Sequence, residues 1–168
     1  MKMSESLEAK FNDQITLEFE ASLVYRQLAI EMDLRDLPGI AGWLRAQAED
    51  ELVHAHKWID HLTARENHPR IGAVPAPKVD AAHTVLDVFE VALEHEQRVS
   101  AAVRELYRAA MDDIDSKQLI QWFADDQVAE EAVIHEIVGR LELIDNDGPG
   151  LLRIDRELAA RSATTTTA

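Results

Sequence analysis

Apolar residues recur along the chain with the three- and four-residue spacing of an α-helix, in four long segments. Each segment carries an acidic residue in the middle of its apolar stripe, where a helix that faces a protein core is normally uncharged. These residues are Glu18, Glu51, Glu96 and Glu130. No segment shows the strict alternation of a β-strand, so the pattern predicts an all-α protein whose helices turn carboxylates toward a shared core.

Turn-forming residues between the segments set the predicted helix boundaries. The four long helices should cover about residues 5–34, 38–66, 83–111 and 116–144. Ser4 can cap the first helix, and Asp115 or Ser116 can cap the fourth. After the breaking residues 146–150, a short fifth helix is expected at residues 151–161, and residues 162–168 should form a disordered tail.

The connection between the second and third helices is the longest one in the chain. It covers residues 67–82 and contains Pro69, Gly72, Pro75 and Pro77. Such a length exceeds the usual link between neighbouring helices and can span a bundle from end to end. We therefore expect the second and third helices to run parallel, in a four-helix bundle with one long crossover.

Composition narrows the classes of function. The chain of 168 residues suits a single domain, at residues 1–161, and acidic residues exceed basic ones by 15. This charge argues against binding nucleic acid, and no apolar run is long enough for a membrane span. The N-terminus lacks the pattern of a signal peptide, so the cytoplasm is the expected compartment. Without cysteine, metal ligands must come from His, Asp, Glu and Gln, which favours hard metals.

The central carboxylates are the candidate metal ligands. Glu51 and His54 are three residues apart, so both side chains leave the same face of a helix and can bind one ion. Burying several carboxylates together costs several kcal/mol each unless cations or protons neutralise them. A pair of iron or manganese ions would do so. The alternative is a metal-free polar network, in which protonated carboxyls and Gln127 bond to one another.

Several segments resemble bacterial non-haem ferritin, and the resemblance extends over about residues 6–160. The matching segments occur in the same order and cover residues 12–18, 48–54, 94–97, 121–123 with Gln127, and the fifth helix. The resemblance implies a ferritin-like four-helix bundle with a fifth C-terminal helix.

The same resemblance implies roles for individual residues. The iron site would consist of Glu18, Glu51 and His54 at the first ion, with Glu51 bridging, Glu96 and Glu130 at the second, and Gln127 and Tyr25 beside the pair. A third iron site, known in bacterial ferritins, would use Asp50 and Asp126. Ala129 stands where a glutamate is expected, so a tight third site is not predicted.

The implied activity is that of a ferroxidase, which stores and detoxifies iron. Two Fe(II) ions would react with dioxygen or hydrogen peroxide, and the ferric product would enter a mineral inside a hollow shell of 24 identical subunits. In such a shell the fifth helix packs at a symmetry axis, whereas packing on its own subunit is the simpler alternative.

Three alternative classes of protein make different predictions about the sequence or the chemistry. A haem-containing bacterioferritin would carry a methionine after Glu51 and a histidine three residues after Glu130, but Leu52 and Val133 stand there, so no haem is expected. A rubrerythrin would need cysteine ligands for its additional iron. An acidic helical scaffold without metal, which binds a partner protein, predicts no iron oxidation above background.

Overall fold

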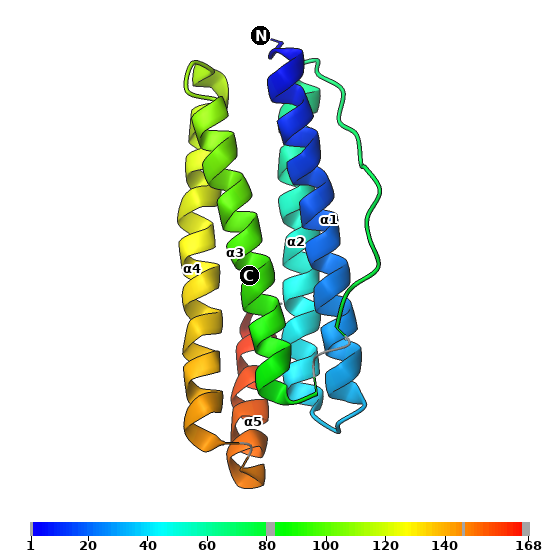
Figure 1. Ribbon diagram of the computed structural model, residues 1–168, viewed down its shortest axis with the longest axis vertical. Coiled ribbons are helices and arrows are strands. Elements are labelled where there is room, and N and C mark those ends of the chain that lie inside the picture. Colours follow the sequence, from blue (N-terminus) through cyan, green and yellow to red (C-terminus); the bar gives the residue numbers. More distant parts are fainter. Residues whose placement is uncertain (1, 80–82, 146, 166–168) are drawn as a thin grey trace.

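The structure is a computed structural model that describes residues 2–79, 83–145 and 147–165. These residues form five helices and no strand, as the apolar spacing predicts (Figure 1). The helices are α1 (Glu5–Asp33), α2 (Pro38–Ala64), α3 (Val85–Ala109), α4 (Ile114–Ile144) and α5 (Gly148–Thr165). None of the described helices combines the length and apolarity needed to cross a membrane.

The long connection between α2 and α3 is a crossover, as predicted. It passes along the outer side of α1 from one end of the bundle to the other, so α2 and α3 run in the same direction (Figure 1). Side chains of α1 accept hydrogen bonds from the backbone of this crossover. Asn12 accepts a hydrogen bond from the amide of Arg70 at 2.7 Å, and Thr16 accepts one from Gly72 at 2.8 Å. The crossover is thereby fixed to the helix beside it.

Capping side chains explain where α1 and α3 begin. The Ser4 hydroxyl accepts a hydrogen bond from the amide of Leu7, as expected of a capping serine. Thr84 and Asp87 cap α3 reciprocally, because each side chain binds the backbone amide of the other residue.

The prediction for the start of α4 is wrong. The helix begins at Ile114, before either predicted capping residue, and Asp113 occupies the cap position without capping it. The Asp113 carboxylate instead binds the guanidinium of Arg65 and the hydroxyl of Ser116. This interaction joins the end of α2 to the start of α4, which a single-helix capping rule cannot anticipate.

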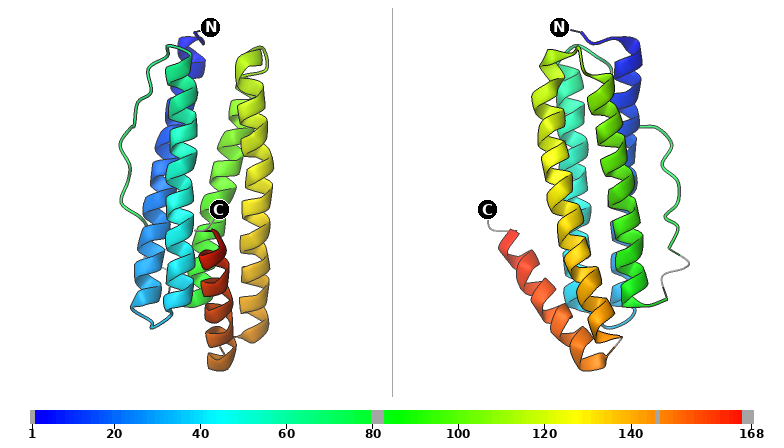
Figure 2. Two further views of the ribbon diagram at one scale, coloured as in Figure 1. Left: turned by 180° about the vertical axis from the view of Figure 1, so that it is seen from behind. Right: turned by 60° about the vertical axis from the view of Figure 1, so that its left-hand side comes forward.

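The fifth helix is longer than predicted and packs mainly on α2 of its own chain (Figure 2). Ile154 and Leu158 are buried, whereas Leu152 is half exposed. The helix continues through residues 162–165, where a disordered tail was expected, because no Gly or Pro follows Arg161 to end it. The last residues of that expected tail, 166–168, lie outside the described part of the chain.

The buried apolar residues form two clusters rather than one. The cluster nearer the N-terminus of α1 includes Phe11, Trp58 and Phe123, and the other includes Tyr25 and Phe89. The acidic positions of α1, α2 and α3 fall between the two clusters in sequence on each helix. A polar layer therefore divides the core.

Candidate metal centre

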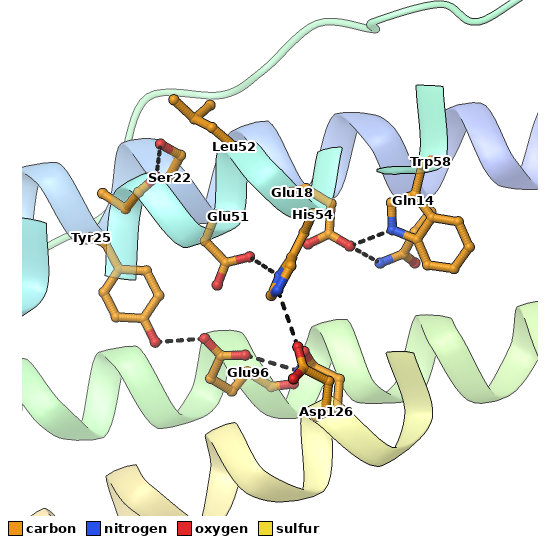
Figure 3. A network of polar contacts seen from close by, with 12 residues as sticks. Gln14, Glu18, Ser22, Tyr25, Glu51, Leu52, His54, Trp58, Glu96 and Asp126 are labelled. Atoms are coloured by element: carbon orange, nitrogen blue, oxygen red, sulfur yellow. Dashed lines mark hydrogen bonds and ion pairs between the residues drawn. The ribbon is translucent and has the colours of Figure 1, made fainter. Parts of the chain in front are cut away.

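The polar layer is made of side chains from all four long helices. Glu18 comes from α1, Glu51 and His54 from α2, and Glu96 from α3 (Figure 3). Gln127 comes from α4. All five are buried: Glu18 is 0% exposed, Glu96 1% and Glu51 4%. Charged side chains are almost never buried to this extent unless they are paired, so this layer requires an explanation.

Helix geometry and one interhelical bond set the relative positions of these groups. His54 follows Glu51 by three positions, so the two side chains lie on one face of α2. One turn after Glu18, the Ser22 hydroxyl donates a 2.7 Å hydrogen bond to the carbonyl of Ala48 on α2. This bond fixes the register of α1 against α2 next to the site.

Glu18, Glu51 and His54 form the most compact group. One ligand atom from each lies within 4.8 Å of the others, which is close enough for all three to contact a single ion. Such a group of carboxylate oxygens and one imidazole nitrogen suits iron or manganese. The first-ion ligands implied by the sequence resemblance are therefore together in the structure.

The two oxygens of Glu18 have different surroundings. Oε1 accepts hydrogen bonds from the Gln14 amide and from the Trp58 indole, both at 2.8 Å (Figure 3). Oε2 is buried and, within the described residues, has no hydrogen-bond partner. A buried oxygen without a partner costs about 1–3 kcal/mol. A cation between Glu18, Glu51 and His54 would satisfy Oε2, so the donor set fits a metal ion.

His54 is held at both ring nitrogens. Nδ1 lies 3.2 Å from Oε2 of Glu51, and Nε2 lies 3.1 Å from Oδ2 of Asp126 (Figure 3). Burial lowers the pKa of the imidazole, which favours the neutral form. A neutral imidazole has a single N–H, so it can donate to only one of these carboxylates.

Glu96 is the centre of the second half of the site. It accepts hydrogen bonds from the Tyr25 hydroxyl at 2.5 Å and from the Gln127 amide at 2.9 Å. Gln127 also lies within hydrogen-bond distance of Ser100, whose hydroxyl donates to Glu131. Burial, together with the charge of Glu96, raises the pKa of Tyr25 well above 10, so its phenol stays protonated.

The carboxylates of the layer are strained electrostatically when no cation is present. Burial raises the pKa of Glu18 to about 7, and burial with the charge of Glu96 raises that of Glu130 to about 7. Burial, with the charges of Glu96 and Glu18, raises the pKa of Glu51 well above its usual value. Burial raises the pKa of Glu96 as well, although hydrogen bonds from Tyr25 and Gln127 lower it. Protons or cations must neutralise these groups.

The remaining predicted residues lie at the edge of the layer. Glu130 is half-buried on α4, near enough to Glu96, Asp126 and Asp50 for their charges to raise its pKa. Asp50 is half-buried too, and burial and the charge of Asp126 raise its pKa. Among the described residues, the only group of three close potential ligands is Glu18, Glu51 and His54.

Two contacts of the site were not anticipated from sequence. The Trp58 indole on α2 and the Gln14 amide on α1 both donate hydrogen bonds to Glu18. A helical signal existed for both residues: Gln14 is one turn before Glu18, and Trp58 is one turn after His54. That spacing places each residue on the ligand face but does not show which group it contacts.

Comparison with known proteins gives consistent results. The family model of the ferritin-like domain matches residues 8–144. Bacterial non-heme ferritin of Escherichia coli is 35% identical over 153 residues, which cover 89% of this chain and 92% of that protein. The protein of the same name from Staphylococcus aureus is 31% identical over 162 residues, with coverage of 95% and 97%.

Solved structures of similar fold include the open-pore ferritin of the archaeon Archaeoglobus fulgidus. Its TM-score is 0.91 at 34% sequence identity, and the match covers 94% of this chain and 96% of that one. An engineered closed form of that ferritin matches with the same TM-score, over 97% of its own chain.

Proposed function

Because this chain belongs to the ferritin family, whose fold supports iron storage, we propose that it oxidises Fe(II) at a buried dinuclear centre and stores the ferric product within a protein shell. The observation that best supports this proposal is the buried, unpartnered Oε2 of Glu18 beside Glu51 and His54. In a scaffold that never binds metal, burying the carboxylates of Glu18 and Glu51 beside the imidazole of His54 would cost free energy without compensation.

The two ions would use different sides of the polar layer. Glu18 and His54 would bind the first ion, and Glu96 and Glu130 the second. Glu51 would bridge them, because the charges of both Glu18 and Glu96 act on its carboxylate. Gln127 and Tyr25 would act through Glu96, which both hold by hydrogen bonds. Each of the two bonds ends on a different oxygen of Glu96, so together they fix the orientation of its carboxylate.

The proposed reaction balances for either oxidant. Each of two Fe(II) ions loses one electron, and dioxygen takes both electrons and two protons to give hydrogen peroxide. Hydrogen peroxide as the oxidant takes two electrons and two protons and gives two water molecules. Hydrolysis of the ferric product then releases protons. Carboxylates, as hard ligands, bind both oxidation states of iron and let the product leave for the mineral.

The proposed container is a shell of 24 chains with the mineral inside. Several large apolar side chains are exposed in the single chain, including Leu143 at 85%, Ile114 at 78% and Leu34 at 76%. Exposed apolar groups of this size are typical of surfaces that contact other subunits. Assembly would cover such groups and would separate the mineral from the surrounding solution.

Replacement of Glu96 by Gln tests the centre. This change keeps the shape of the side chain but removes one ligand oxygen and its charge. We expect the initial rate of ferric absorbance, after Fe(II) addition under air, to fall at least about tenfold, because weaker disturbances of metal sites already have such effects. Glu94→Gln is the matched control: Glu94 is an exposed glutamate on the same helix, and its replacement should leave the rate unchanged.

The metal-free scaffold makes the opposite prediction for this pair. In that case wild type, Glu96→Gln and Glu94→Gln would all oxidise iron at the rate of buffer alone. Equal, rapid oxidation by all three proteins would also count against the proposed centre, since it would place the reaction elsewhere on the protein.

A further inference from the structure

The contact between Asp126 and His54 links α4 to the site on α2. Oδ2 of Asp126 lies 3.1 Å from Nε2 of His54, and the opposite ring nitrogen faces Glu51 at 3.2 Å (Figure 3). The His54 side chain is 7% exposed and that of Asp126 29%, so the carboxylate reaches the imidazole from the rim of the site.

This geometry decides which nitrogen of His54 can bind a metal ion. Glu51, on the side of Nδ1, is a proposed ligand of the first ion, so an ion bound there would face Nδ1. The single ring proton would then lie on Nε2, where the Asp126 carboxylate accepts it. The lone pair of Nδ1 is then free on the side of Glu51 and Glu18. A carboxylate that accepts the second N–H of a metal-binding histidine fixes both the tautomer and the ring orientation.

Two aromatic rings restrict the orientation further. Phe123 and Trp122 contact the imidazole edge to face, with centroids 5.4 Å and 5.9 Å away and interplanar angles of 80° and 76°. The ring is thus confined from the side of α4, and Asp126 selects which nitrogen points into the site.

We propose that Asp126 is a positioning residue for His54, which prepares Nδ1 for the first ion, rather than a ligand of a third ion. This inference rests on the proposed function, because it assigns a role within the same centre. It replaces the role in a third site that the family resemblance gave to Asp126.

The surroundings of Asp126 are poorly suited to a third ion. One of its oxygens already contacts His54, and the neighbouring position on α4 that should supply a glutamate is Ala129. Asp50 and Glu130 are the acidic groups whose pKa values the charge of Asp126 raises. Within the described residues, however, these three carboxylates do not converge closely enough to form a three-ligand group.

The test uses the full-length protein and anaerobic calorimetric titration with Fe(II). Asp126→Ala removes the acceptor, and we expect the affinity of the first ion to fall about 10- to 100-fold with the number of ions per chain unchanged. Asp126→Asn retains an oxygen that can accept the Nε2 proton, so it should restore most of that affinity. Asp125→Asn is the matched control: it removes the neighbouring exposed carboxylate on α4, which accepts a hydrogen bond from Gln121 rather than contacting His54, and should leave the first ion unaffected.

A ligand of a third ion would give a different set of results. Both Asp126 variants would then bind one ion fewer than wild type, and the first ion would keep its wild-type affinity. That result would overturn the positioning role, as would an Asp126→Ala protein with wild-type affinity and stoichiometry. Failure of the proposed function itself is separate, because wild type would then bind no Fe(II) in the same titration.

Discussion

At the scale of single residues, the polar layer brings together carboxylates whose burial is unfavourable for each of them separately. Glu18 is fully buried, and the Gln14 amide and the Trp58 indole both donate to the same one of its two oxygens. Glu51 is buried beside it and beside Glu96. The metal-free protein can lower this electrostatic energy only by protonation, so its stability must depend on pH.

The direction of that dependence follows from the raised pKa of Glu18. The pKa is about 7 in the folded chain and 4.5 for the free side chain, so between these values the folded state holds a proton that the unfolded state has released. The free energy of unfolding of the metal-free protein should therefore fall as pH rises from 4.5 to 7, by on the order of a few kcal/mol for this group. Above pH 7 its contribution should be constant.

Thermal denaturation of the metal-free protein at pH 5 and pH 7.5 measures this effect. Glu18→Gln has no charge to titrate, so the difference between the two pH values should be smaller than in wild type. A redox-inert divalent cation such as Zn(II) should stabilise wild type most at the higher pH, where the ligands are ionised. An identical pH difference in wild type and Glu18→Gln would contradict the assignment.

At the scale of elements, the start of α2 depends on α5. Leu37 cannot cap α2 with its side chain, and Pro38 has no amide proton. Asp155 on α5 supplies the missing acceptor, because its Oδ1 binds the amide of Ile40 at 2.8 Å. The backbones approach so closely that a Cβ on Gly39 would lie 2.0 Å from the carbonyl oxygen of Asp155. A side chain of α5 therefore caps the N-terminus of α2.

Two glycine substitutions test this packing. Gly39→Ala should force α5 away from α2, lower the free energy of unfolding by more than about 1 kcal/mol and speed hydrogen exchange within α5. Gly139→Ala on α4 is the control: a Cβ there meets nothing within 4 Å, so the helix should be unchanged or stabilised by up to about 1 kcal/mol. Slow exchange in α5 of the Gly39 variant would show that α5 does not depend on this contact.

Sequence patterns located the elements well and their mutual contacts less well. Helical spacing placed Glu18, Glu51 and Glu96 on faces that the structure buries, because that property belongs to one helix at a time. Glu130, expected at the same depth, is only half-buried. The bond of Trp58 to Glu18 and the contact of Asp126 with His54 each join two helices. Such pairs depend on the rotation and register of one helix against another, which the spacing within either helix does not specify. The displaced start of α4, set by Arg65, has the same origin.

At the scale of the whole molecule, the single chain is incomplete as a container. The five helices of the described residues pack around the proposed metal centre, so a mineral would have to lie outside the single chain, and apolar side chains such as Leu143 and Ile114 are left exposed. Assembly into a shell would account for both features. The proposed shell predicts a particle of about 24 times the chain mass of 18.9 kDa.

Light scattering coupled to gel filtration measures that mass directly, and electron microscopy of iron-loaded protein should show a dense core inside each particle. A chain that elutes as a monomer or dimer, with iron bound only at the centre, would contradict storage in a shell. It would leave the oxidation reaction itself intact, because all proposed ligands come from one chain.

Because the polar layer divides the core, the stability of the helical bundle should depend on the iron that it binds. Two separate apolar clusters lie on either side of Glu18, Glu51 and Glu96, so without a cation these carboxylates, when ionised, repel one another across the middle of the protein. Cations bound as proposed would replace this repulsion by attraction and so link the long helices. Iron scarcity would thus loosen the protein from its centre outward, and susceptibility to proteolysis would report how much iron the centre holds.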